Sequence, residues 1–155
     1  MPLNWPNTLT WLRICAIPLV AGLFVLVEGL EQSGAIGALS ESLHSYAQQS
    51  ARLTGGVAGL GVGFVCNLVN NLPAGLIAGT AVHAAAVPPN IASSILIGVD
   101  LGPNLSVTGS LATILWLDAL RREGLHVRAR DFLQLGVLIM PPALVLALAV
   151  TVGTW

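Results

Sequence analysis

Long hydrophobic stretches separated by short polar segments make up most of the chain. The first stretch, about residues 9–30, is long enough to cross a bilayer core of about 30 Å as a helix, with Arg13 suited to a membrane interface. The last stretch, residues 132–155, is also apolar, and Pro141 and Pro142 predict a kink near its middle. Both are therefore predicted to be membrane-spanning helices.

Residues 34–53 show a different pattern. Ile36, Leu39, Leu43 and Tyr46 recur at helical spacing, while polar side chains occupy the opposite face. This amphipathic pattern favours a helix that lies in the membrane interface, although an ordinary solvent-exposed connector helix would show the same pattern.

The apolar stretch from residue 54 to residue 87 is interrupted at its centre by Asn-Leu-Val-Asn-Asn-Leu-Pro, residues 67–73. Each half has only about 13 residues, roughly 20 Å of helix, which is too short to cross the bilayer alone. We therefore expect a re-entrant hairpin in which protein or water forms hydrogen bonds with the polar backbone groups of the turn. Glycines repeat at every fourth position, at Gly55, Gly59 and Gly63 in the first half and at Gly75 and Gly79 in the second, which predicts close packing of both halves.

Residues 91–120 form the next predicted unit. A short apolar helix, about residues 91–99, leads into Asp-Leu-Gly-Pro-Asn-Leu-Ser-Val-Thr-Gly-Ser at residues 100–110, and the helix then resumes to residue 120. This is the pattern of one discontinuous transmembrane helix. The predicted fold is thus all-α and integral to the membrane. It is a single domain with a spanning helix, an interfacial helix, a hairpin, a broken helix and a last spanning helix.

Composition and charge support a membrane location. Hydrophobic residues make up 55% of the chain, charged residues only 8%, and the mean hydropathy is +0.83, whereas a soluble domain carries about 25% charged residues. The net charge of -1 leaves no basic surface for nucleic acid. Four of the six basic residues lie in the loop of residues 121–131, which the positive-inside rule places in the cytoplasm. We expect a multi-pass protein of the cell (inner) membrane with its C-terminus outside.

The two polar breaks are the candidate functional site. Unpaired polar groups in hydrocarbon cost several kcal/mol each, and paired broken segments mark the solute site in secondary transporters. The candidate substrate-binding residues, all amides or hydroxyls, are Asn67, Asn70, Asn71, Asn104, Ser106, Thr108 and Ser110. Asp100, the only charged residue between Leu53 and Leu117, could couple protons to transport. The amides and hydroxyls could instead bond neighbouring helices for structure alone, and Asp100 could instead cap the amides of its own loop.

Four segments of the sequence closely resemble one family. They are Pro-Leu-Val-Ala-Gly-Leu-Phe-Val-Leu-Val-Glu (18–28), Cys-Asn-Leu-Val-Asn-Asn-Leu-Pro-Ala-Gly-Leu-Ile (66–77), Leu-Ile-Gly-Val-Asp-Leu-Gly-Pro-Asn-Leu-Ser-Val-Thr-Gly-Ser-Leu-Ala-Thr-Ile-Leu-Trp-Leu (96–117) and Met-Pro-Pro-Ala-Leu (140–144). They resemble the C-terminal region of the arsenical pump membrane proteins, the ArsB arsenite efflux family. The resemblance extends from about residue 18 to the end of the chain.

This resemblance implies the ion transporter superfamily fold, which has two inverted repeats, with this chain as the second. It implies export of arsenite or antimonite in exchange for protons, and in some members a soluble arsenite-stimulated ATPase partner. By the same likeness, Asn70, Asn71, Asn104, Ser106 and Thr108 would line the solute site, and Asp100 would help to couple protons. A full carrier is much longer, so this chain would need the missing first repeat or a homo-oligomer partner and should not transport alone.

Residues 1–17 resemble the start of a CDP-alcohol phosphatidyltransferase. The metal-binding motif of that family, DGxxAR followed by GxxxDxxxD, is absent because no aspartate here precedes a glycine. We therefore expect no enzyme activity, no metal site and no cofactor. Two alternatives to the arsenite carrier stay open: half of a sodium-coupled carboxylate carrier, and a non-transporting membrane subunit that pairs with a separately encoded first repeat.

Overall fold

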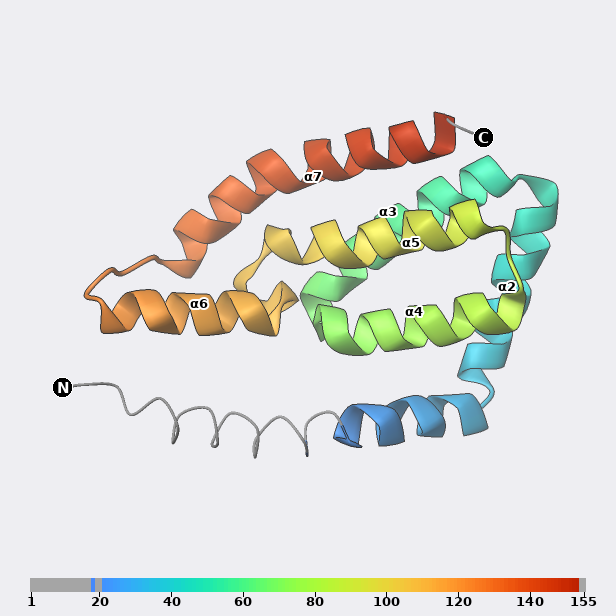
Figure 1. Cartoon of the computed structure of the whole chain (residues 1–155), viewed down its shortest axis with the longest axis horizontal. Helices are drawn as coiled ribbons and strands as arrows, with labels where there is room; N and C mark the ends of the chain where they lie inside the picture. The colour runs from blue at the N-terminus through green and yellow to red at the C-terminus, as the bar shows by residue number, and fades with distance from the viewer. Residues whose placement is uncertain (1–17, 19–20, 154–155) are drawn as a thin grey trace.

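The computed structural model describes residue 18 and residues 21–153, and this part of the chain consists of helices and the turns between them. In chain order the helices are a first segment Ala21–Gln32, α2 (Ala35–Gln49), α3 (Ala51–Val69), α4 (Asn71–Ala85), α5 (Pro89–Leu101), the short 3₁₀ segments η1 (Gly102–Leu105) and η2 (Val107–Gly109), α6 (Leu111–Arg122) and α7 (Ala129–Gly153). In Figure 1, α3 to α7 run roughly along the long axis of the molecule, and α2 crosses them near one end.

The first helical segment and α2 meet at a sharp bend. The angle between them is 70°, and Gly34 in the turn has a φ of 80°, a conformation that glycine adopts most easily. Helix from residue 21 onward agrees with the predicted first spanning helix, whereas residues 9–17, 19 and 20 of that prediction lie outside the described residues.

The chain covers only part of the apolar face of α2. Ile36 is buried, whereas Leu39 and Tyr46 are exposed, and Ser40 of the predicted polar face is buried. Ser40 can be buried at low cost because its hydroxyl donates to the carbonyl of Gly37 at 2.9 Å. The predicted apolar face of α2 is thus only partly used within the chain.

The first arm of the hairpin is longer than predicted. Ser50 ends α2 and caps α3, since its hydroxyl accepts from the Leu53 amide at 3.4 Å. The helix therefore begins at Ala51 and includes Arg52 and Leu53, which the sequence pattern had placed in the preceding helix. With 19 residues, or about 28 Å, α3 is long and apolar enough to cross a membrane. The predicted arm length of about 13 residues is therefore too short for α3.

The second arm, α4, turns back against the first. Asn70 has a φ of 73° between the two helices, and its side-chain oxygen accepts from the Leu72 amide at 3.2 Å, which caps α4. The arm has 15 residues, or about 22 Å of helix, shorter than a bilayer core. Figure 1 shows α3 and α4 running in opposite directions from this turn.

The predicted interruption between residues 100 and 110 is present. Pro89 starts α5 at its first turn, as proline favours, and the helix continues to Leu101, longer than the predicted 91–99. After η1 and η2, the hydroxyl of Ser110 caps α6 by accepting from the Ala112 amide at 3.2 Å. In Figure 1, α6 continues in the same general direction as α5 but is displaced sideways from it.

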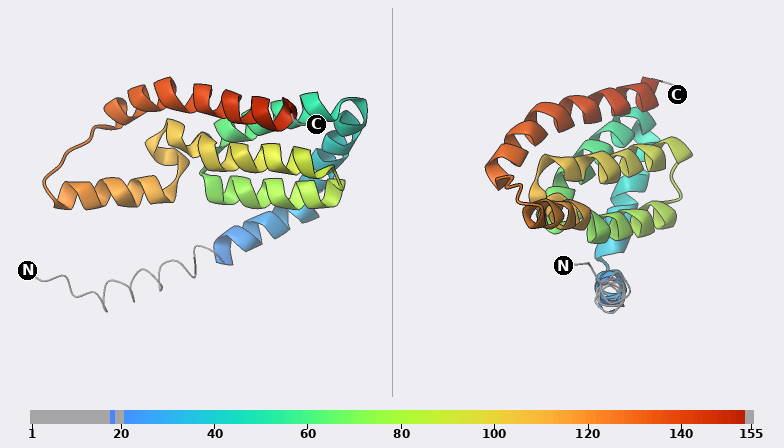
Figure 2. Two further views of the ribbon diagram at one scale, coloured as in Figure 1. Left: turned by 45° about the horizontal axis from the view of Figure 1, so that its top comes forward. Right: turned by 60° about the vertical axis from the view of Figure 1, so that its left-hand side comes forward.

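The last helix, α7, begins at Ala129 and passes through Pro141 and Pro142 without interruption. Its axis curves along its length in Figure 1. The views in Figures 1 and 2 agree that α5 lies between α7 and α4. Met140, Leu144 and Leu148 of α7 form one buried cluster, with Leu101 and Leu105 packed against it.

The tightest packing in the molecule is the crossing of α3 and α5. A Cβ added to Gly98 would overlap the carbonyl of Gly59, and one added to Gly102 would overlap the carbonyl of Gly63. These glycines therefore allow backbone-to-backbone contact, as predicted for the first glycine repeat. In the second repeat, a Cβ added to Gly75 would lie 3.2 Å from a methyl carbon of Val99, whereas Gly79 has nothing within 4 Å, so close packing is observed at Gly75 but not at Gly79.

Much of the outer surface is apolar. On α7, Leu138 is 71% exposed and Leu146 is 67% exposed. Among the described residues, α3 and α7 are long and apolar enough to be spans, with the bent pair of Ala21–Gln32 and α2 as a third candidate. Exposed leucines on such helices fit contact with lipid or with further protein.

Candidate functional site

The two polar breaks lie against each other, and Asn67 joins them. Asn67 is in the last turn of α3, where its side-chain Nδ2 donates to the carbonyl of Gly63 at 3.0 Å and to that of Gly102 at 2.9 Å. Its Oδ1 accepts from the backbone amide of Ser106 at 3.0 Å and from the Ser106 hydroxyl at 2.9 Å. The hairpin and the broken helix are therefore bonded directly at their interruptions.

The hydrogen-bonding capacity of Asn67 is fully used in this arrangement. A side-chain amide has two donor hydrogens and two acceptor lone pairs. The two hydrogens bond to Gly63 and Gly102, and the two lone pairs accept from Ser106. The main-chain carbonyl of Asn67 also accepts, from the Thr108 hydroxyl at 3.1 Å. The geometry supports a positioning role for Asn67, because its side chain has no donor or acceptor left for a solute.

Gly109 is part of the same junction. A Cβ at this position would lie 2.7 Å from Oδ1 of Asn67 and 2.5 Å from the carbonyl oxygen of Pro103. Both contacts are too short for a carbon atom, so a side chain here would push the broken helix away from α3. Gly102 and Gly109 were not among the predicted site residues, because a glycine offers no functional group and the fold alone reveals the close approach.

The two hydroxyls of the junction have fewer hydrogens than contacts. The Ser106 hydroxyl donates to Asn67 Oδ1 and the Thr108 hydroxyl donates to the Asn67 carbonyl, while the two hydroxyl oxygens lie 3.1 Å apart. Each hydroxyl has only one hydrogen to donate. Three oxygen–oxygen contacts therefore share two hydrogens, and this cluster is suited to receive a further hydrogen-bond donor or a cation.

Asn70 connects the hairpin turn to η2, the second 3₁₀ segment of the broken helix. Its Nδ2 donates to the carbonyl of Thr108 at 3.2 Å. A cavity of about 300 Å³ lies beside it, lined by Leu23, Val69, Asn70, Leu72, Pro73 and Leu111. Asn70 keeps one donor and one acceptor position beyond its bonds to Thr108 and Leu72, so it can bond a small molecule in this cavity.

The remaining candidate residues are placed differently from one another. Asn71, the first residue of α4, is half-buried, and its side chain has no hydrogen bond within the described residues. The side chain of Asn104 is exposed and donates to the carbonyls of Asp100 and Leu101. Ser110 caps α6. Asn71 is thus the amide of the hairpin turn with the most unused capacity.

Asp100 is exposed near the end of α5. Within residue 18 and residues 21–153, its carboxylate makes no hydrogen bond or ion pair, so the alternative in which it caps its own loop is not observed. Asp118, by contrast, pairs with Arg122 at 2.8 Å on the surface, as its spacing predicts.

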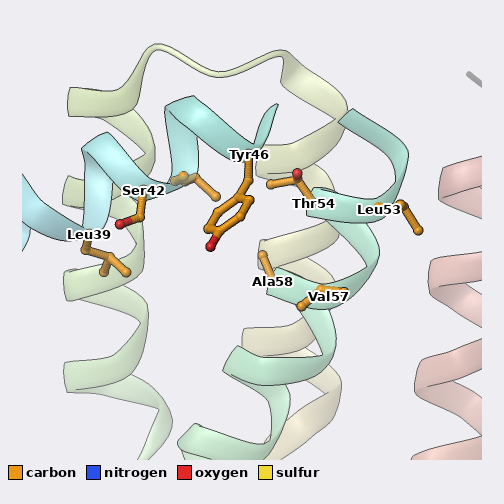
Figure 3. A pocket seen from close by; sticks show the side chains of 8 residues that line it. Leu39, Ser42, Tyr46, Leu53, Thr54, Val57 and Ala58 are labelled. Carbon is orange, nitrogen blue, oxygen red and sulfur yellow. The ribbon is translucent and has the colours of Figure 1, made fainter. Parts of the chain in front are cut away.

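A second hollow lies away from the polar junction, between α2 and the start of α3. It has a volume of about 410 Å³ and is lined by Leu39, Ser42, Leu43, Tyr46, Leu53, Thr54, Val57 and Ala58. Figure 3 shows the Tyr46 side chain reaching from α2 towards Ala58 of α3. Its lining is almost entirely apolar, which fits contact with hydrocarbon better than binding of a polar solute.

Comparisons with known proteins cover nearly the whole chain. Residues 11–155 match the family model described as "ArsB: Arsenical pump membrane protein". An arsenical pump membrane protein of Escherichia coli is 29% identical over 136 residues, which is 83% of this chain and 31% of that protein. One from Yersinia enterocolitica is 27% identical over 132 residues, with the same shares. The chain thus spans about a third of the length of these relatives, and no solved structure matches it.

Proposed function

Because the chain belongs to the arsenical pump membrane protein family, we propose that it forms the C-terminal part of a secondary transporter that exports arsenite or antimonite in exchange for protons. The observation that carries this proposal is the bonded junction of the two polar breaks in a chain of this family. The relatives are about three times longer, so we propose that transport requires a further region that corresponds to the rest of their length.

We propose that the described helices form the second of two inverted repeats. Three features support this arrangement: the 70° bend before α2, the antiparallel pair α3 and α4, and the interrupted helix formed by α5 and α6. In such a fold, α2 lies in the membrane interface and the turn at Asn70 lies part of the way across the bilayer, where polar groups are tolerated next to protein or water.

The solute is proposed to bind at the junction. Trivalent arsenic in neutral water is an uncharged trihydroxide, so it brings three O–H donors and several lone pairs. The hydrogen-poor pair Ser106 and Thr108 would accept from it, while the free positions on Asn70 and Asn71 could donate and accept. Asn67 would hold the two breaks in register without touching the solute, and Asn104 would line the exposed side.

Asp100 is proposed to carry the exchanged proton. It is the only charged residue between Leu53 and Leu117, and carboxylates within membrane segments commonly serve as proton relays in transporters. We also propose that the loop of residues 121–131, with Arg121, Arg122, Arg128 and Arg130, faces the cytoplasm, which would put the C-terminus outside.

A chimeric carrier tests this function. Residues 21–155 replace the matching segment of the E. coli relative, and arsenite uptake is measured in everted membrane vesicles from cells without another arsenite exporter. We expect proton-driven uptake that Asn71→Ala and Asn104→Ala abolish at unchanged membrane levels. Wild-type uptake in both variants would remove these side chains from the site. Loss of the protein from the membrane would instead assign them a structural role.

The oxygen cluster also favours a second candidate, a sodium-coupled carrier. The hydroxyl oxygens of Ser106 and Thr108 lie close to each other and to the main-chain carbonyl oxygen of Asn67, and such neutral oxygens suit a hard cation as well as a hydroxyl donor. Uptake by the chimera that requires sodium and persists without a proton gradient would favour this candidate. Uptake that follows the proton gradient at constant sodium would exclude it.

A further inference from the structure

One side of α5 stays uncovered along its whole length. Ser93, Leu96 and Asp100 of α5 and Asn104 of the following η1 are all exposed at helical spacing, and we call these four residues the acceptor stripe. The opposite side of α5 is buried against the rest of the chain, with Ile91 and Ser94 completely buried. The stripe is therefore the face of α5 that is free to contact another molecule.

The unused hydrogen-bonding groups of the acceptor stripe are all acceptors. The Ser93 hydroxyl donates to the carbonyl of Pro89 at 3.0 Å, and Nδ2 of Asn104 donates to the carbonyls of Leu101 at 3.0 Å and Asp100 at 3.4 Å. Within the described residues, Oδ1 of Asn104 and both carboxylate oxygens of Asp100 have no partner. A molecule that covers this face must therefore supply donors.

The position of Asp100 increases this requirement. It is the second-last residue of α5, where the aligned carbonyls of the helix make the local potential negative and disfavour an anion. A charged aspartate near the middle of a membrane helix costs about 2.5–3.5 kcal/mol in insertion experiments. A cationic donor at the same depth would offset both effects.

The segment from residue 53 to residue 120, which includes α5, contains no cation of its own. The chain has no lysine, and no arginine lies between Arg52 and Arg121, so a second copy whose α5 lies alongside would bring only neutral side chains or its own Asp100. We propose that the acceptor stripe is the docking surface for a transmembrane helix of another polypeptide region that carries an arginine or lysine opposite Asp100. Leu96, which is 59% exposed and one turn away from Asp100, would give the apolar contact.

This inference rests on the proposed function, which places α5 within the bilayer, and it gives Asp100 and Asn104 a contact in addition to their proposed roles in transport. It is tested with the full chain in lipid vesicles and synthetic 21-residue leucine-rich transmembrane peptides that carry a single arginine, glutamine or leucine at the centre. Association is measured by energy transfer between a label on the chain and a label on the peptide. We expect the arginine peptide to associate at least tenfold more tightly than the leucine peptide, a difference of about 1.4 kcal/mol.

The matched variants are Asp100→Asn, which removes the charge at almost constant volume, and Asp118→Asn, which removes a carboxylate that is already paired with Arg122. The preference for arginine should disappear in the first and persist in the second. Equal association of all three peptides, or a preference that survives Asp100→Asn, would overturn the inference. Self-association of the chain that is lost in Asp100→Asn would also overturn it, by assigning the stripe to a second copy. Arsenite uptake by the chimera is measured separately. A negative result in the peptide experiment therefore does not decide the transport proposal, and a negative uptake result does not decide the docking proposal.

Discussion

Replacing Asn67 by alanine should loosen the contact between the hairpin and the broken helix. The substitution removes four side-chain hydrogen bonds, two donated to Gly63 and Gly102 and two accepted from Ser106. Hydrogen bonds between membrane helices average about 0.6 kcal/mol each, and those in soluble proteins about 1 kcal/mol. Four such bonds predict a loss of about 2–4 kcal/mol in the free energy of unfolding.

The assay is reversible unfolding of the full chain in mixed dodecylmaltoside and SDS micelles, followed by tryptophan fluorescence. Hydrogen exchange of the backbone amides in residues 102–110 is measured under native conditions and should become faster in Asn67→Ala. The matched control is Asn71→Ala, because the Asn71 side chain makes no hydrogen bond within the described residues. The control should change the stability by less than about 0.5 kcal/mol. Equal losses in the two variants would refute the positioning role of Asn67.

Three further predictions concern packing and surface charge. Gly98→Ala should destabilise the chain by about 1–3 kcal/mol because its Cβ would overlap the Gly59 carbonyl. The control Gly61→Ala, on the open side of α3, should be neutral or stabilising by up to about 1 kcal/mol. Equal effects of the two substitutions in the same unfolding assay would argue against the close crossing of α3 and α5. The double variant Gly109→Ala, Asn67→Ala should lose less unfolding free energy than the two single variants lose together, because both substitutions disrupt the same junction. Strict additivity would mean that the two residues act independently. Asp118→Asn should cost no more than about 0.5 kcal/mol, since its partner Arg122 is well exposed; a loss above about 2 kcal/mol would mean that this pair is covered in the folded protein.

The order of the elements could be predicted from the sequence because each boundary has a local cause. Pro89 and the polar segment around Asp100 interrupt the apolar runs, and Asn70 permits the tight turn between α3 and α4. The predicted boundary at residue 53 is wrong, because Arg52 belongs to the first turn of α3 and not to the preceding polar helix. An arginine in the first turn does not stop a helix that a serine already caps, so α3 gained the length of a full span.

The roles of individual site residues could not be predicted in the same way. The sequence shows that Asn67 and Asn71 both border the first break, but not that one has all its bonds made within the protein while the other has none. That difference depends on residues 102–109, far away in sequence. Periodicity also does not show which residues of the apolar face of α2 this chain covers, because lipid or further protein can cover the exposed Leu39 and Tyr46.

The central claim is that the polar turns lie about halfway across the bilayer. The most direct test is depth-dependent quenching of tryptophan by lipids brominated at different positions of their acyl chains. The probe is Leu72→Trp at the hairpin turn, with Tyr46→Trp on α2 as the interfacial reference and the native tryptophans replaced by phenylalanine. The account predicts that Leu72→Trp is quenched most by bromine near the chain ends and Tyr46→Trp by bromine near the glycerol. Strongest quenching of Leu72→Trp by the shallow bromine would place the turn at the surface and contradict the account.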